Sequence, residues 1–266
     1  MKAILKYPGS KWSKAEWITS FFLPHHSYLE PYFGSGAVLF NKERSNIETV
    51  NDLDNNVVNL FEWIKRDPEK LAHEIYYTPY ARQVYEDAFA MEPKNSLEKA
   101  LFFYIRLNMG HGYRTSGERV GWKNDIQGRE KAYAAKDWCE IPQKILQAAE
   151  RLRGVQIENR PALELIMRLN YKNVLIYCDP PYMLQTRHGK QYRHEMSESD
   201  HEELLQLLLK HKGYVILSGY DTDLYNDTLK EWNRYETTSY TQSQTMKREV
   251  IWLNYDPPGQ QLSLRI

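Results

Sequence analysis

The sequence predicts an α/β fold, in which a mostly parallel, Rossmann-like sheet carries helices on both faces and is interrupted by a mainly helical insertion. Two observations predict it. Apolar runs of strand type alternate with helical segments near both ends of the chain, whereas residues 60–159 show mainly helical periodicity. We therefore expect one domain from residues 1–59 and 160–266 and a second domain from residues 60–159.

Composition narrows the class of protein. The 266 residues include 35 Lys and Arg against 35 Asp and Glu, so the overall charge gives no support for a nucleic-acid partner, and that case depends on local patches. The two cysteines, Cys139 and Cys178, make no disulfide framework. With no charged-then-apolar leader and no apolar run of ~18 residues, we expect a cytoplasmic protein outside membranes. We also expect a monomer, and no metal site, since His25 and His26 lack partners at ligand spacings.

The N-terminal third begins with an apolar stretch, a Pro8-Gly9 turn and Lys11, ahead of a helix expected from about Ser13 to Phe22. Residues 28–40 predict a strand, a glycine turn and a helix, because glycines permit positive φ and let a ligand approach the backbone. Residues 49–54 predict a second strand ending in acids. An acid at this position can accept hydrogen bonds from ribose hydroxyls, and Asp54 is expected to cap the helix beginning at residue 55.

The insertion combines helices with one polar loop. We expect a helix continuing through Leu60–Ile64, helices beginning at Asp67-Pro68 and spanning Leu97–Leu107, and a last helix over Ile141–Leu152 that returns the chain to the sheet. Between them, residues 108–123 predict a loop and hairpin that carry Arg114, Arg119 and Lys123 with aromatics in between. Such a stretch suits phosphate contacts and base-edge readout, with arginine favoured for guanine; the structural alternative is a solvated loop.

The most informative stretch is a buried strand, Val174–Cys178, that ends abruptly in Asp179-Pro180-Pro181-Tyr182. The prolines stop the strand, and a carboxylate at the carboxyl end of a buried strand lies where open α/β sheets bind ligands. Cys178 is expected to be a small buried hydrophobe.

The remaining elements follow in order. Residues 183–196 form a polar stretch that could close over substrate and that includes Tyr192 and His194. Ser197 and Asp200 suggest a capped helix ending near Gly213. Strands are expected over residues 214–220 and 248–254.

Methyl transfer to an exocyclic amine is chemistry that such a tetrapeptide can support. The amine lone pair is delocalised into its ring, and pyramidalising the nitrogen requires acceptors for its hydrogens. Asp179 could accept one hydrogen and the Pro180 carbonyl the other, while Tyr182 offers a ring for the base to stack on. The alternative is a strand followed by a Pro-Pro turn with an N-capping Asp.

Four motifs in this order resemble the Dam-like, D12-class family of S-adenosylmethionine-dependent DNA adenine-N6 methyltransferases. They are Tyr7-Pro8-Gly9-Ser10-Lys11, Pro31-x-Phe33-Gly34-x-Gly36, Asp52, and Asp179-Pro180-Pro181-Tyr182. Tyr7 stands where tryptophan is more usual, and Pro8-Gly9-Ser10 replaces a small-Gly-Gly sequence. The motif order, with the insertion before the tetrapeptide, resembles the alpha arrangement of amino-methyltransferases. The resemblance is specific at the motifs and loose in the insertion.

The resemblance implies a class I methyltransferase sheet, S-adenosyl-L-methionine as cofactor and double-stranded DNA as partner, with the target adenine flipped out of the duplex. It assigns site residues in three groups. The cofactor would be held by Tyr7, Lys11, Phe33, Gly34, Gly36, Asp52 and Asp179. The catalytic group would be Asp179, Pro180 and Tyr182. DNA would be contacted by Lys6, Arg114, Arg119, Lys123, Tyr192 and His194.

Several alternatives stay open at this point. Cytosine-N4 methyltransferases usually carry serine in the place of Asp179, and methylation of RNA adenine or of a protein glutamine is a more distant possibility. From a different class, a DNA-binding regulator could use the same scaffold without catalysis, although it would not need Asp179. GATC is the site of the best-known relatives, but the insertion is where such enzymes diverge. The sequence is compatible with an orphan enzyme, a phage enzyme or a restriction-modification partner.

Overall fold

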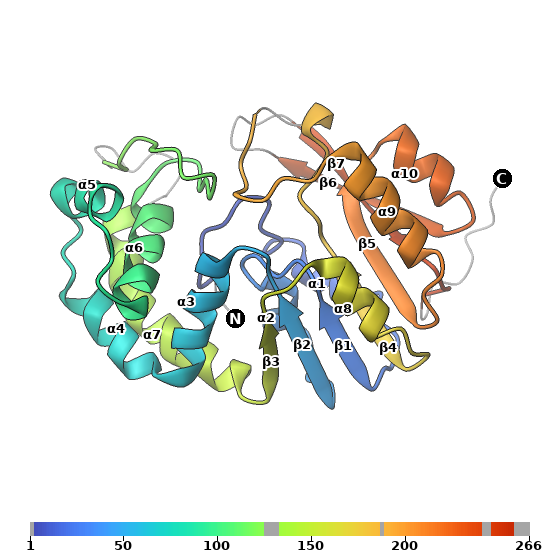
Figure 1. The fold of residues 1–266 in the computed structure, drawn as a ribbon, viewed down its shortest axis with the longest axis horizontal. Coiled ribbons are helices and arrows are strands. Elements are labelled where there is room, and N and C mark those ends of the chain that lie inside the picture. The colour runs from blue at the N-terminus through green and yellow to red at the C-terminus, as the bar shows by residue number, and fades with distance from the viewer. Residues whose placement is uncertain (1–2, 125–132, 187–188, 241–245, 258–266) are drawn as a thin grey trace.

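A seven-stranded sheet with strand order β3-β2-β1-β4-β5-β7-β6 forms the centre of the computed structural model, which describes residues 3–124, 133–186, 189–240 and 246–257 (Figure 1). The strands are β1 (Ser27–Glu30), β2 (Ile47–Asn51), β3 (Val155–Glu158), β4 (Val174–Cys178), β5 (Tyr214–Tyr220), β6 (Asn233–Tyr240) and β7 (Met246–Leu253). Strands β1 to β5 pair in parallel, whereas β7 runs antiparallel to both β5 and β6. The predicted α/β fold with a mostly parallel sheet is confirmed.

Helices cover both faces of this sheet. They are α1 (Ala15–Thr19), α2 (Ala37–Asn41), α3 (Asn55–Arg66), α4 (Pro68–Tyr77), α5 (Arg82–Ala90), α6 (Ser96–Met109), α7 (Ala134–Leu152), α8 (Ala162–Arg168), α9 (Glu198–Leu208) and α10 (Asp223–Thr228). Figure 1 shows α8, α9 and α10 in front of the sheet. Among the helices of the described ranges, none is both long and apolar enough to cross a membrane.

Alternation along the central strands explains the two layers of core. In β4, Leu175 and Tyr177 belong to the apolar cluster that includes residues of α2, α3, α6 and α7, whereas Ile176 and Cys178 belong to the cluster that includes residues of α8 and α9. Successive side chains of a strand point to opposite faces, so a strand apolar at every position is buried on both sides. All five residues of β4 are buried, as the sequence predicted.

Helix starts follow the capping rules. The Asp54 carboxylate accepts a hydrogen bond from the backbone N–H of residue 56 at the start of α3. Asp67 caps α4, which begins with Pro68. Ser197 and Asp200 form a reciprocal capping box at the start of α9. All three helix starts were predicted from the sequence.

The predicted domain boundaries do not match the elements. Helix α3 runs without a break through the boundary set between residues 59 and 60. Strand β3, placed in the insertion by the prediction, pairs in parallel with β2 and forms one edge of the sheet. Its burial pattern, with one buried residue out of four, lacks the continuous apolar run that marks β4. The sheet therefore resumes at residue 155, five residues before the predicted boundary.

The polar loop at residues 108–123 is closed at its base but contains little strand. Gly110 and Trp122 form an isolated antiparallel bridge. The His111 N–H donates to the Gly121 carbonyl at 2.9 Å, and the Lys123 N–H to the Met109 carbonyl at 2.8 Å. The expected hairpin is thus reduced to a short antiparallel pairing that holds a long loop.

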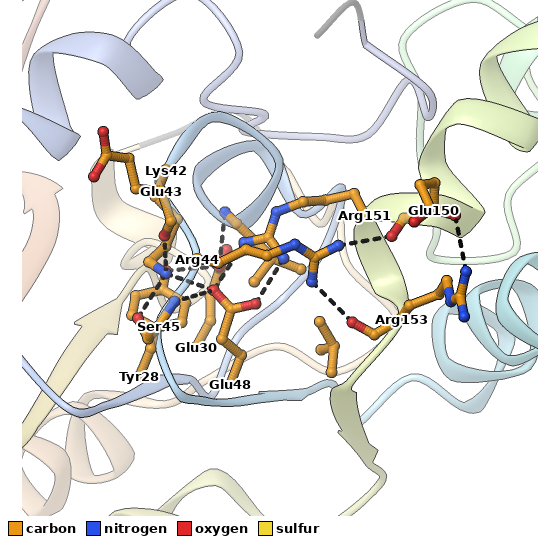
Figure 2. Close-up of polar contacts among 12 residues, drawn as sticks. Tyr28, Glu30, Lys42, Glu43, Arg44, Ser45, Glu48, Glu150, Arg151 and Arg153 are labelled. Atoms are coloured by element: carbon orange, nitrogen blue, oxygen red, sulfur yellow. Dashed lines mark hydrogen bonds and ion pairs between the residues drawn. The ribbon is translucent and has the colours of Figure 1, made fainter.

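A buried ionic network fixes the last insertion helix, α7, to the sheet, as Figure 2 shows. Arg151 makes a two-pronged contact with the Glu48 carboxylate of β2, at 2.6 and 2.8 Å. Lys42 donates to the same carboxylate at 2.6 Å. Arg44 donates to two backbone carbonyls at the carboxyl end of α7. Because the pairing is bidentate and the groups are largely buried, it fixes orientation as well as position.

Candidate functional site

The site lies at the carboxyl ends of the parallel strands, between β1 and β4. From β1 the strand order proceeds outward to β2 and β3, while β4 and β5 lie on the other side, which makes the gap between β1 and β4 a topological switch point. Open α/β sheets bind their ligands in the crevice at such a point. The turn after β1 and the tetrapeptide after β4 therefore face each other across one pocket.

The pocket encloses about 790 Å³, including the space at its mouth. Its walls include the N-terminal loop, the ends of β1 and β2, the tetrapeptide and the segment before α9. The lining residues with predicted roles are Tyr7, Lys11, Phe33, Gly34, Asp52, Asp179, Tyr192 and His194. Gly36, Pro180 and Tyr182 are not in the lining, although their neighbours in the same motifs are.

The glycine turn has a conformation that other residues rarely adopt. Gly34 has φ 50° and Gly36 has φ 68°. A Cβ at Gly36 would lie only 2.5 Å from the Phe33 ring and 2.8 Å from the Phe40 ring. Glycine at both positions lets aromatic rings pack directly against the turn, because a side chain at Gly34 would meet the Tyr7 ring as well.

Asp52 holds this turn in place. Its Oδ2 accepts from the Gly34 N–H and its Oδ1 from the Asp54 N–H, each at 2.8 Å. Burial raises the pKa of Asp52 to about 7, although the two backbone donors oppose the rise. Each carboxylate oxygen has a second lone pair, so Asp52 can brace the turn and still accept a hydrogen bond from a ligand.

Asp179 takes part in an ionic cluster at the inner end of the pocket. Its Oδ2 lies 2.9 Å from Lys11 Nζ, which also lies 3.2 Å from Glu249 Oε1. Burial raises the pKa of Asp179 to about 6; Lys11 opposes the rise and Glu249 adds to it. Burial lowers the pKa of Lys11, but Asp179 and Glu249 raise it by more, so the ammonium stays charged. The other Asp179 oxygen, Oδ1, is buried and makes no hydrogen bond within the described residues.

Tyr182 is packed on the same cluster. Lys11 Nζ lies 4.7 Å from the centre of its ring, and its hydroxyl donates to Glu249 Oε1 at 2.9 Å. The Tyr220 ring meets it edge-on, with centroids 4.4 Å apart. If the target base stacks on Tyr182, as the sequence led us to expect, the Lys11 ammonium would contact the same ring.

A second buried acid, Glu30, lies at the end of β1 and lines the pocket. Its Oε2 accepts from the Tyr28 hydroxyl at 2.8 Å and from the Leu39 N–H at 3.2 Å. Burial raises the pKa of Glu30 to about 8, against the effect of the Tyr28 hydrogen bond, and nearby Asp179 adds to the rise. Close to neutral pH, Glu30 is therefore largely protonated.

The segment before α9 covers part of the pocket. The Tyr192 hydroxyl donates to the Pro8 carbonyl at 3.2 Å, and its ring centroid lies 6.0 Å from that of Tyr7. His194 lines the pocket beside it. Tyr192 and His194 thus lie at the wall of the pocket, and the DNA contact expected of them stays a prediction. Residues 187 and 188 of this segment lie outside the described ranges.

Thr115 joins the insertion loop to this covering segment. The Thr115 N–H donates to the Gln191 carbonyl at 2.9 Å, and the Thr115 hydroxyl accepts from the Arg193 N–H at 3.2 Å. Thr115 is buried although the loop around it is polar. The loop expected to read DNA is thus hydrogen-bonded directly to the segment that covers the pocket.

The other predicted DNA contacts all have partners within the protein. Arg114 pairs with Glu118 at 2.5 Å, Arg119 with Glu86 at 2.7 Å and Lys6 with Asp137 at 3.0 Å. These three pairs are at least partly exposed, and such pairs are weak enough for a phosphate or a base to compete.

Lys123 differs from the other predicted contacts. It is 9% exposed, its ammonium lies 4.1 Å from the centre of the Tyr113 ring, and it donates to the Asn108 carbonyl at 3.5 Å. Lys123 is therefore buried and supports its own loop, and the phosphate contact expected of it stays a prediction. No pattern in the sequence indicated this burial, because lysine is mostly exposed in proteins.

Sequence reasoning missed Glu30 and Glu249. Glu30 directly precedes the glycine motif at the end of a strand, and that position was the available signal. Glu249 had no motif around it; the only hint was a charged residue that opens an apolar run in the last strand. Its proximity to Asp179 depends on the antiparallel course of β7, which single-sequence patterns do not specify.

Comparisons with known proteins identify the family of this chain. A model of the family of D12 class N6 adenine-specific DNA methyltransferases matches residues 7–245. Two proteins named DNA adenine methylase, from two strains of Vibrio cholerae serotype O1, are each 23% identical to this chain over 188 residues. Each alignment covers 68% of this chain and 65% of the relative, so the aligned part spans just under two thirds of the relative's length.

All four sequence motifs fall within the stretch that the family model covers, and all four contribute residues to the pocket walls, where Asp52 also braces the glycine turn. The chain belongs to the family of D12 class N6 adenine-specific DNA methyltransferases.

Proposed function

We propose that the protein transfers a methyl group from S-adenosyl-L-methionine to adenine N6 at a specific site in double-stranded DNA, with the target base flipped out of the stack. The observation that carries the proposal is the buried Asp179 Oδ1, which makes no hydrogen bond within the described residues and stands at the inner end of a pocket between two sheet strands. A buried acceptor without a partner is costly, and a donor on the substrate relieves that cost.

The residues present fit the cofactor. The pocket combines a glycine turn that contributes Gly34 to the wall, aromatic side chains from Tyr7 and Phe33, and Asp52 beside the turn. When bound, S-adenosylmethionine would supply a methyl group on a sulfonium sulfur. Tyr7, Phe33, Gly34 and Asp52 would hold it, and the nearby Asp179 carboxylate would suit its positive charge.

The protein's contribution to the reaction is position and charge. Asp179 Oδ1 would accept a hydrogen from the adenine amine, and the Pro180 carbonyl would accept the other, which frees the nitrogen lone pair. Once methylated, the nitrogen is cationic and loses a proton to water, so no strong base is required. Alignment of the amine with the methyl group accounts for most of the rate gain. Tyr192 and His194 would exclude water from above the pocket.

DNA itself would meet the face formed by the insertion loop, with Arg114 and Arg119 as base readers and Lys6 as a phosphate contact. Their partly exposed ion pairs support this assignment, because the arginines would exchange a carboxylate for a guanine edge without leaving the surface. We also propose that the protein acts as a monomer in the cytoplasm.

The test is methyl transfer with purified protein. Unmethylated duplex DNA and methyl-labelled S-adenosylmethionine should yield N6-methyladenine at one sequence context, found by sequencing the modified DNA, and Asp179→Ala should abolish it. N4-methylcytosine as the product would establish the cytosine enzyme instead. Tight duplex binding without any methylated base, in a protein that binds the cofactor poorly, would favour the DNA-binding regulator.

A further inference from the structure

Glu249 belongs to β7, which lies two strands away from β4 in the sheet order. It pairs with Tyr220 at the last register position between β5 and β7. Because β7 runs antiparallel to β5, the start of β7 lies at the edge where the parallel strands end. A residue near the end of the chain is thereby brought beside the tetrapeptide that follows β4, and its side chain is 8% exposed.

One oxygen of Glu249 receives two contacts. Its Oε1 lies 3.2 Å from Lys11 Nζ and accepts from the Tyr182 hydroxyl at 2.9 Å. Lys11 is itself 2.9 Å from Asp179 Oδ2, and its side chain is 6% exposed. Glu249 therefore touches both residues that flank Asp179 in space, without an ion pair or hydrogen bond of its own to Asp179.

The charges of the cluster show what Glu249 adds. Lys11 with Asp179 alone would form a neutral pair, and a lone buried ammonium would hold the Asp179 carboxylate strongly. With Glu249 the cluster has two carboxylates for one ammonium. When both are ionised, it carries a net charge of about −1 in a site of low dielectric, where such a charge acts strongly on a cation.

We propose that Glu249 is a positioning residue for methyl transfer: it shares Lys11 and anchors the Tyr182 hydroxyl, so that Asp179 keeps one oxygen for the amine and the cluster keeps a negative charge. That charge favours the cationic nitrogen that forms as the methyl group arrives. This inference rests on the proposed function. Glu249 touches Lys11 and Tyr182 rather than substrate, so it acts through them.

Other charged and titratable groups also face Asp179 and must be considered in any pH measurement. Besides Lys11 and Glu249, they are Glu30 on β1, Tyr177 and Cys178 on β4, Tyr182 and Tyr225. Among these, Glu249 is the one whose charge raises the pKa of Asp179 from β7. Removing that charge should lower the pKa of Asp179, because Lys11 would then pair with Asp179 alone.

The experiment compares Glu249→Gln with wild type in two measurements. In the first, aspartate labelled with ¹³C at the carboxyl is titrated by NMR, with Asp179→Asn to identify the resonance. In the second, kcat and KM for DNA are measured against pH. We expect the Asp179 midpoint to fall below about 6, the acid limb of the rate profile to move the same way, and kcat to fall by about ten- to a hundredfold with little change in KM.

Glu48→Gln is the matched control, since Glu48 is also buried and ion-paired with a lysine, but away from the pocket. It should lower the melting temperature and leave the Asp179 titration unmoved. An unchanged Asp179 midpoint and unchanged kcat in Glu249→Gln would overturn the inference. If wild-type protein methylates nothing, the proposed function fails, while the titration still decides whether Glu249 controls Asp179.

Discussion

Asp179 is the residue on which the proposed chemistry depends most. Asp179→Ala removes the buried Oδ1 that has no hydrogen-bond partner within the described residues, so methyl transfer should fall by ~10²-fold or more. Lys11 would keep Glu249 as its counterion, so the fold should persist. Single-turnover methyl transfer and a thermal melt check both statements. Asp179→Asn, which keeps one acceptor oxygen, should retain more activity than Asp179→Ala; a rate close to wild type in Asp179→Ala would exclude this role.

Asp52 offers a test that does not depend on catalysis. S-adenosylmethionine should raise the melting temperature, and Asp52→Ala should reduce that rise, because the glycine turn loses the acceptor for its Gly34 N–H. A roughly tenfold weaker affinity corresponds to about 1.4 kcal/mol. The matched control is Asp67→Ala, which removes the cap of α4. It should lower the melting temperature by itself and keep the full cofactor-induced rise. An undiminished rise in Asp52→Ala would remove Asp52 from the cofactor site.

Among single residues, those next to a distinctive local sequence pattern could be predicted. Asp179 and the glycine turn follow strands and are marked by proline or glycine, whose backbone restrictions are visible in any sequence. Glu249 and the burial of Lys123 were not predictable in this way. Both depend on contacts between residues far apart in the chain, which no local pattern records.

Among the elements, the loop at residues 108–123 contains two kinds of residue: arginines expected to read bases, and a lysine that supports the loop itself. Replacing Arg114 or Arg119 by Ala should cost ~1–3 kcal/mol at the cognate duplex and relax preference at one base position. Lys123→Ala should instead lower the melting temperature, because Lys123 is buried against Tyr113. Affinities for cognate and singly mismatched duplexes, measured at several salt concentrations, distinguish the two kinds of residue.

Opposite behaviour would reassign these residues. If Lys123→Ala left the melting temperature unchanged and reduced the salt slope by about one, Lys123 would be a phosphate contact after all. Unchanged affinity and unchanged site preference in both arginine variants would leave recognition to the segment that covers the pocket.

Prediction of elements succeeded where the pattern was local and strong. The caps of α3, α4 and α9 and the apolar runs of β4 and β5 were all predicted. Strands β3 and β6 were missed, because an edge strand is buried on few positions and its sequence resembles a polar loop. The predicted boundary between residues 159 and 160 falls after β3 for the same reason, since β3 carries no apolar run that would have marked it.

For the molecule as a whole, Glu30 should make stability depend on pH. The pKa of Glu30 is raised from its ordinary value of 4.5 to about 8 in the folded protein. Between these values the folded state binds more protons than the unfolded state, so Glu30 lowers stability as pH rises through this window. Glu30→Gln, which keeps an acceptor for Tyr28 and Leu39, should therefore be more stable relative to wild type at pH 9 than at pH 5. Denaturant midpoints at the two pH values measure the difference.

For Glu48→Gln we expect the opposite dependence of stability on pH. Burial alone would raise the pKa of Glu48, but its bonds to Arg151 and Lys42 lower it below the ordinary value. Its stabilising contribution is thus present above the unfolded pKa and is lost as pH falls. The variant should lose most stability near neutral pH and least in acid. If Glu30→Gln showed the same profile as Glu48→Gln, the protonated state assigned to Glu30 would be wrong.

The bonds from Thr115 to Gln191 and Arg193 have a consequence for turnover. One end of this connection belongs to the loop that we assign to DNA, and the other to the segment above the pocket. When the loop is bound to the duplex, these hydrogen bonds would also restrain the segment above the pocket. The demethylated cofactor would then dissociate slowly until the duplex is released. We expect such a protein to modify neighbouring sites on one DNA molecule in separate encounters, each with a fresh cofactor, rather than during a single visit.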